Sequence, residues 1–166
     1  INTEFSNKLY DLFLKSNATV FITLSSVKAI LDFANSEITE ETIPSPSSHY
    51  GKSKLLAEEY IFSTKIPLGK RVYVLRPCII HGNGIKGNLK LLYNILMKFR
   101  FWPLNDFNNK RSYLTVENLC FVINELIIRK DIKSGIYNVA DDIPLSTKEV
   151  VGIVESSTNT KIFKLK

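Results

Sequence analysis

The sequence places a tyrosine and a lysine four residues apart, at Tyr50 and Lys54, at the start of the segment Tyr50-Gly-Lys-Ser-Lys-Leu-Leu-Ala-Glu-Glu-Tyr60. Residues four apart on an α-helix lie on the same face, so the phenol and the ammonium group can reach one small volume. A free tyrosine has a pKa of about 10, and a cation held close to a phenol favours its ionised form. Such a phenol can act as a general acid and base. The same spacing also occurs by chance, so the pair needs support from the rest of the chain.

Two serines at the end of a predicted strand give the first support. Thr19–Ser25 is rich in β-branched and aromatic residues, which is typical of a buried strand, and it stops at Ser25-Ser26. Ligands of an open α/β sheet bind just beyond the carboxyl ends of its strands, so hydroxyl groups there are well placed to contact one. The alternative is that Ser25 or Ser26 only caps the next turn.

The segment that leads to Tyr50 is predicted to be a long loop. Asn35–His49 is rich in Glu, Thr, Ser and Pro and has no sustained apolar period. Loops of this length are uncommon in compact domains unless they serve a function. Ser47 and Ser48 then offer N-caps for the helix that carries Tyr50 and Lys54.

The remaining elements alternate between strands and helices. A second strand is expected over Arg71–Arg76 and ends at Pro77, because proline cannot donate to a sheet ladder. Further helices are expected over residues 1–17, 89–99, 117–129 and after Ser146, further strands over 110–116 and 136–140, and an irregular stretch over 102–109. This alternation predicts an α/β fold with a parallel sheet.

Composition excludes several classes of function. The 166 residues are 45% hydrophobic, enough to fill the core of one domain, and no apolar run reaches the roughly 18 residues of a membrane span. We therefore expect a cytoplasmic protein that binds no membrane. Cys78 and Cys120 fit reduced core residues, and with His49 and His81 as the only histidines no metal is expected. The net charge of +6 is scattered, which favours a phosphorylated ligand over nucleic acid.

Three features stand in chain order: a strand ending in Ser25-Ser26, a helix starting Tyr50-x-x-x-Lys54, and a strand ending in Leu75-Arg-Pro77. Together they resemble the extended short-chain dehydrogenase/reductase family, in particular its NAD-dependent nucleotide-sugar epimerases, dehydratases and ketoreductases. The segments that carry the likeness are Phe21–Lys28, Tyr50–Glu58, Leu75–Gly82, Ile85–Leu89, Lys110–Leu119 and Gly135–Val139.

The resemblance implies a role for each matching residue at the cofactor. Tyr50 matches the acid/base that takes a proton from a sugar hydroxyl as hydride leaves the same carbon for the nicotinamide. Lys54 matches the residue that favours the phenolate and hydrogen-bonds the nicotinamide ribose. Ser26 matches the residue that hydrogen-bonds the reacting oxygen. Pro77 lies where the family's chain passes the nicotinamide, and Ser25 is expected to contact the cofactor.

The resemblance also implies a nucleotide-diphosphate sugar as substrate and a homodimer as the full-length protein. Asn88 and Leu89 match the segment that contacts the nucleotide diphosphate, and Arg111 matches the arginine that pairs with its pyrophosphate. A planar guanidinium suits phosphate oxygens, although an exposed arginine in a strand is usually solvated. Before Asn88, the glycine-bearing loop 83–87 with Lys86 would place a helix N-terminus beside an anionic group.

Part of the family's pattern has no counterpart in these residues. The N-terminal strand and the Gly-x-x-Gly-x-x-Gly turn are missing, so we expect an N-terminally truncated chain that alone binds little or no NAD and is therefore inactive. The expected fold is the C-terminal part of a Rossmann-like parallel sheet plus part of a smaller α/β substrate domain. Residues 1–82 are assigned to the dinucleotide-binding part, and 83–166 mainly to substrate binding, interleaved with the sheet.

Three functions remain open on these residues. The first is an NAD-dependent nucleotide-sugar 4-epimerase, in which hydride leaves C4, the keto sugar rotates and hydride returns to the other face. The second is a 4-keto-sugar reductase or dehydratase of the same family, which would use the same Ser26, Tyr50 and Lys54. The third is a non-catalytic α/β module. The residues do not distinguish the sugar, or NAD from NADP.

Overall fold

The computed structural model describes residues 2–82, 88–104 and 109–165. The chain forms two compact units, and it passes between them three times. The first unit comprises Ile1–Cys78 and Leu119–Val139, and the second comprises Ile79–Asn118 and Ala140–Lys166. The sequence-based roles of residues 1–82 and 83–166 stay a prediction. In the described part of the chain, no helix is both long and apolar enough to span a bilayer.

A three-stranded parallel sheet forms the first unit. Its strands are β1 (Val20–Leu24), β2 (Arg71–Pro77) and β6 (Gly135–Val139), in the order β1-β2-β6. Leu24 lies opposite Leu75, and the Ser25 N–H extends this ladder by donating to the Leu75 carbonyl at 2.7 Å. The parallel pairing expected from the alternation of strands and helices is therefore confirmed.

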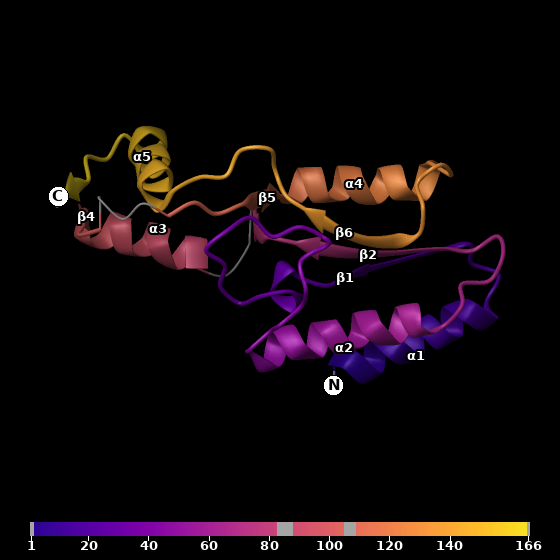
Figure 1. Cartoon of the computed structure of the whole chain (residues 1–166). Helices are drawn as coiled ribbons and strands as arrows, with labels where there is room; N and C mark the ends of the chain where they lie inside the picture. Colours follow the sequence, from indigo (N-terminus) through magenta and orange to yellow (C-terminus); the bar gives the residue numbers. More distant parts are fainter. Residues whose placement is uncertain (1, 83–87, 105–108, 166) are drawn as a thin grey trace. The chain divides into compact units, whose positions relative to one another are not determined.

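Helices cover both faces of this sheet. Figure 1 shows α1 (Asn2–Lys15) and α2 (His49–Ser63) on one side and α4 (Val116–Ile128) on the other. The core between the sheet and the first two helices contains Tyr10, Phe13, Ile61, Val72 and Val74. Since side chains alternate along β2, Tyr73 points to the opposite face, where its hydroxyl donates to the Ile132 carbonyl at 2.8 Å.

The second unit is built from short strands and two helices. Its helices are α3 (Asn88–Phe99) and α5 (Thr147–Thr158). Its parallel strand pairs are β3 (Ile79–His81) with β5 (Tyr113–Thr115), and β4 (Phe101–Trp102) with β7 (Phe163–Lys164). A small core of Leu96, Val151 and Ile162 packs the helices onto β4 and β7.

Some expectations are corrected. The strand expected over 110–116 covers only Tyr113–Thr115, because Arg111 forms an isolated antiparallel bridge with Leu145 instead. The prediction of an irregular stretch over 102–109 was wrong at Trp102, which lies in β4. Cys120 is exposed on α4, so it is not a core residue, and neither Cys78 nor Cys120 forms a disulfide. The loop 83–87 with Lys86 lies outside the described residues.

Candidate functional site

The candidate site in the first unit begins at the carboxyl end of β1. Ser25 is buried at 7% exposure. Ser26 is the N-cap of a short 3₁₀ helix, η1 (Val27–Ala29), and its hydroxyl accepts a hydrogen bond from the Lys28 N–H at 3.2 Å. The capping alternative is thus correct for Ser26. A hydroxyl has two acceptor lone pairs and one proton, so this bond still allows Ser26 to donate to a ligand.

The first turn of helix α2 packs directly against η1. At Gly51, an added Cβ would lie only 2.3 Å from the Lys28 carbonyl oxygen and 2.8 Å from Pro46 Cβ. A glycine is therefore required at this point of the first turn of α2. The contact sets the turn that carries Tyr50 directly against the turn that carries Ser26.

The start of α2 is fixed by side-chain hydrogen bonds. Ser48 is the N-cap, and its hydroxyl accepts from the Gly51 N–H at 3.0 Å, as the sequence predicted. The Asp32 carboxylate accepts from the Ser48 N–H at 2.8 Å, the Ser47 N–H at 2.8 Å and the Ser47 hydroxyl at 2.9 Å. Hydrogen bonds from Ser48, followed by those from Ser47, hold the pKa of Asp32 well below its usual value. Asp32 therefore attaches the end of the long loop to the segment after η1.

Lys54 lies between Tyr50 and the end of β1. Its Nζ donates to the Leu24 carbonyl at 2.9 Å and lies 5.8 Å from the centroid of the Tyr50 ring. Tyr50 is 47% exposed. The helical spacing of four residues therefore does bring the ammonium group beside the phenol ring, at the sheet edge where Ser25 and Ser26 lie. An ammonium group has three N–H donors, and the bond to Leu24 uses one of them.

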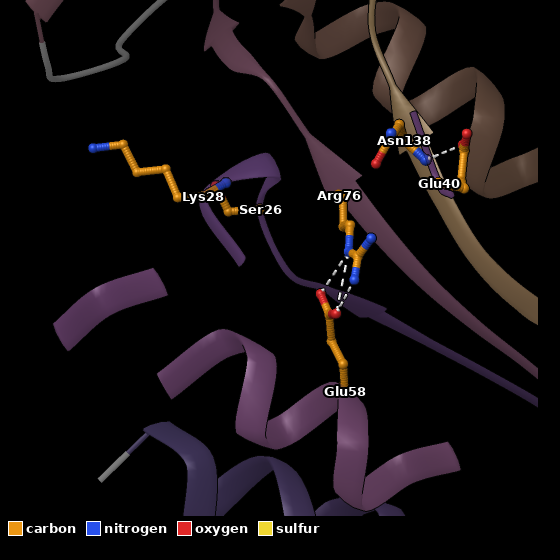
Figure 2. A network of polar contacts seen from close by, with 6 residues as sticks. All are labelled: Ser26, Lys28, Glu40, Glu58, Arg76 and Asn138. Atoms are coloured by element: carbon orange, nitrogen blue, oxygen red, sulfur yellow. Dashed lines mark hydrogen bonds and ion pairs between the residues drawn. The ribbon is translucent and has the colours of Figure 1, made fainter. Parts of the chain in front are cut away.

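The loop between η1 and α2 contains neither helix nor strand, as expected, and is attached to β6. The Glu40 carboxylate accepts from the Asn138 N–H at 2.7 Å (Figure 2). The Ile38 carbonyl accepts from the Asn138 side-chain amide at 3.3 Å. The Ser45 N–H donates to the Ile30 carbonyl at 2.7 Å. The loop is thereby held over the carboxyl end of the sheet, where Tyr50 follows it.

Pro77 is the last residue of β2, where it is buried opposite Val139. The residue before it, Arg76, forms a buried ion pair with Glu58 of α2, which Figure 2 shows from close by. Sequence reasoning missed this pair. The available signal was Glu58 itself, which follows Lys54 by four residues on a helix face that is otherwise apolar at Ala57 and Ile61.

The second unit contains a cavity of about 260 Å³. Leu89, Leu92 and Trp102 form part of its apolar lining, and Asn109 and Arg111 contribute polar groups. Two of the three residues expected to contact the nucleotide diphosphate, Leu89 and Arg111, therefore share one cavity. The third, Asn88, is the first residue of α3.

Comparisons with known proteins identify the family of the chain. The sequence model of the NAD dependent epimerase/dehydratase family matches residues 1–140. Over 156 residues the chain is 29% identical to an N-acetyl-α-D-glucosaminyl-diphospho-ditrans,octacis-undecaprenol 4-epimerase of Escherichia coli O157:H7, covering 90% of this chain and 46% of the relative. It is 28% identical over 159 residues to a UDP-glucose 4-epimerase of Vibrio cholerae, covering 91% and 47% respectively.

The fold is also similar to solved structures. The crystal structure of a UDP-N-acetylglucosamine 4-epimerase from Bacillus cereus superposes with a TM-score of 0.82 at 22% identity, over 99% of this chain and 59% of that one. The chain spans about half the length of the curated relatives that it matches. On the family match over residues 1–140, the chain belongs to the NAD dependent epimerase/dehydratase family.

Proposed function

We propose that the protein is an NAD-dependent nucleotide-sugar 4-epimerase, acting on a UDP-sugar. The observation that carries the proposal is Lys54, held between the Tyr50 ring and the carbonyl of Leu24 at the carboxyl end of β1. Parallel sheets bind ligands at this edge, and Ser26 lies there as well. The curated relatives matched over most of this chain are both 4-epimerases.

The described residues fit the nicotinamide end of NAD. Lys54 has N–H donors beyond the one bonded to Leu24, and these suit ribose hydroxyl groups. Ser25 at the end of β1 and Pro77 at the end of β2 lie on the same sheet edge. When bound, NAD supplies a reversible hydride acceptor. We assign the cofactor to the first unit on this basis. Parallel incubations with NAD and with NADP decide which of the two dinucleotides is used.

Within the proposed reaction, the chain's own residues move and hold the proton. The Tyr50 phenolate accepts the proton of the C4 hydroxyl as its C–H hydride leaves, giving the 4-keto sugar. The phenol then returns that proton to the carbonyl oxygen when the hydride adds to the opposite face, so neither proton nor electrons are consumed. Ser26 donates a hydrogen bond to the reacting oxygen, and Lys54 holds its ammonium group beside the Tyr50 ring.

We assign the nucleotide diphosphate to the cavity of the second unit. Arg111 lines this cavity, and a planar guanidinium can bind phosphate oxygens through two parallel hydrogen bonds. The apolar side chains of Leu89 and Trp102 suit the flat face of a base. Asn88 belongs to the same substrate segment.

Incubation of the full-length protein with NAD and UDP-glucose or UDP-N-acetylglucosamine tests this function, because these 166 residues alone are expected to bind little NAD. A 4-epimerase brings each sugar to a mixture of C4 epimers with no net NADH, whereas a 4-keto-sugar reductase consumes NADH stoichiometrically and a dehydratase releases water. Tyr50→Phe removes the proton carrier and is expected to abolish turnover. Tyr60→Phe is the matched control on the same helix, because the Tyr60 hydroxyl binds Asp11 instead. Unchanged conversion by Tyr50→Phe would refute the proposed role.

We further propose a cytoplasmic homodimer. The exposed apolar side chains of Phe5, Leu9 and Leu12 on α1 support self-association, because exposed apolar patches commonly mark interaction surfaces. Cysteines that form no disulfide suit a reducing compartment. Light scattering coupled to size-exclusion chromatography measures the mass directly. A monomer at micromolar concentration would contradict the dimer.

A further inference from the structure

A buried ion pair joins α2 to β2. The Arg76 guanidinium donates from Nε to the two Glu58 carboxylate oxygens at 3.0 and 3.1 Å, and from Nη2 to Oε2 at 2.5 Å. The Arg76 and Glu58 side chains are only 4% and 2% exposed. Figure 2 shows Glu58 extending from α2 to meet Arg76 from the strand. Both charges are therefore removed from solvent and satisfied by each other.

Stability alone does not explain this pair. Burial of two charges costs about as much as their attraction returns, and well-packed apolar residues of similar volume are often as stable or more so. Apolar residues would suit the position, since Ala57 and Ile61 beside Glu58 are already buried. The ion pair additionally restricts the orientation of α2 relative to β2. A guanidinium that engages both carboxylate oxygens does so in a narrow range of relative orientations.

The pair lies one helical turn from Lys54, the lysine beside the candidate acid/base Tyr50. Glu58 follows Lys54 by four residues, so the two side chains leave the same face of α2. Lys54 is bonded to the carbonyl of Leu24, and Leu24 lies opposite the residue before Arg76 in the β1–β2 ladder. Successive turns of α2 are thus attached to the ends of two neighbouring strands.

The pair also determines where the Lys54 ammonium group binds. Opposite charges four residues apart on a helix attract each other. With Arg76 engaging both oxygens of Glu58, that carboxylate is already matched, and Lys54 binds the Leu24 carbonyl instead. Without Arg76, the unpaired carboxylate one turn away would draw the ammonium group off Leu24 and away from the Tyr50 ring.

We propose that Glu58 and Arg76 are positioning residues for the acid/base pair. Their ion pair fixes the rotation and axial position of α2 against β2, and it leaves Lys54 free to bridge the Leu24 carbonyl and the Tyr50 ring. The role in catalysis rests on the proposed function. The role in placing Lys54 does not, because it concerns contacts within this chain.

The double substitution Glu58→Leu with Arg76→Met tests the proposal, since it removes both charges and keeps an apolar filling. Thermal unfolding reports stability. Competitive acetylation of Lys54, measured by mass spectrometry against Lys65 as the internal reference, reports whether the ammonium group is still held. We expect a folded protein in which Lys54 labels severalfold faster, and in which kcat falls roughly ten- to hundredfold while KM changes little, because small displacements of catalytic groups have effects of this size.

Two further variants complete the design. Arg76→Lys keeps the charge but removes the bidentate geometry, so it is expected to fold and to show the same changes in labelling and kcat to a smaller degree. If the double variant fails to fold, Arg76→Lys tests the positioning role instead. Glu59→Leu, at an exposed neighbouring position, is expected to label and react as the wild type does. Wild-type labelling of Lys54 and wild-type kcat in a folded pair variant would overturn the inference. An inactive full-length wild type would instead reject the proposed function, and the labelling would still decide the placement of Lys54.

Discussion

Substitution of Gly51 by alanine tests the close approach that sets Tyr50 against Ser26. The added methyl group would meet the Lys28 carbonyl oxygen at 2.3 Å, and real Cβ contacts are essentially never below 3.0 Å. The two backbones must therefore separate by at least 0.7 Å along this line. The Pro46 side chain, 2.8 Å from the same point, limits movement in another direction.

The expected cost follows from this clash. Insertion of a methyl group into a tightly packed contact destabilises a protein by about 1–3 kcal/mol. For a chain of this size, that lowers the midpoint of thermal unfolding by roughly 2–12 °C. A displacement of Tyr50 approaching 1 Å is also expected to lower kcat by up to about a hundredfold.

Thermal unfolding followed by circular dichroism, together with steady-state epimerisation, measures both effects. Gly152→Ala is the matched control, because nothing lies within 4 Å of the added atom on α5. The control is expected to be neutral or slightly stabilising, since alanine favours helices over glycine by up to about 1 kcal/mol. Wild-type stability and wild-type kcat for Gly51→Ala would refute the close approach of α2 to η1.

Further predictions concern the loop, the cavity and the last helix. Because the folded-state pKa of Asp32 is depressed, its stabilising contribution is complete above the unfolded pKa of about 4 and is lost as pH falls below it. Urea unfolding should show Asp32→Asn less stable than the wild type at pH 7, with the difference shrinking toward pH 3; a constant difference would contradict this. Arg111→Met should raise KM for a UDP-sugar roughly ten- to hundredfold, as expected for a lost charge-assisted hydrogen bond, with Lys110→Met as control; equal effects would argue against Arg111. Ser146→Ala should destabilise the protein by about 1 kcal/mol in thermal unfolding, because it removes the N-cap of α5; no change would show that this cap is dispensable.

The local features of the site followed from the sequence. A hydroxyl residue before a helix can satisfy the free N–H groups of its first turn. Ser47 and Ser48 were therefore offered as caps and a helix was expected after Ser146, and Ser48 and Ser146 are the N-caps of α2 and α5 in the structure. The spacing of Tyr50 and Lys54 predicted one shared face, because helical periodicity alone decides it. The β1 and β2 strands were found within about two residues, since each is a run rich in β-branched and aromatic residues. The expectation that the first strand is buried was wrong, because β1 is only half-buried, whereas β2 is buried.

The features that were missed depend on contacts between distant residues. Glu58 and Arg76 are 18 residues apart, and nothing local to either predicts that they meet. Asn138 binds Glu40 across 98 residues. The strands β4 and β7 contain two residues each, which is too short for an alternating pattern to appear. Tertiary pairing, rather than local preference, creates these elements.

We propose that Tyr50 carries the proton while hydride leaves and returns. A single-turnover experiment tests this role directly: the full-length protein is loaded with NAD and mixed rapidly with UDP-glucose, and the absorbance of the reduced nicotinamide is followed. Reduced nicotinamide is expected to appear and then decay in the wild type, and Tyr50→Phe is expected to show neither phase although it still binds the substrate. Formation and decay of reduced nicotinamide at wild-type rates in Tyr50→Phe would contradict the claim.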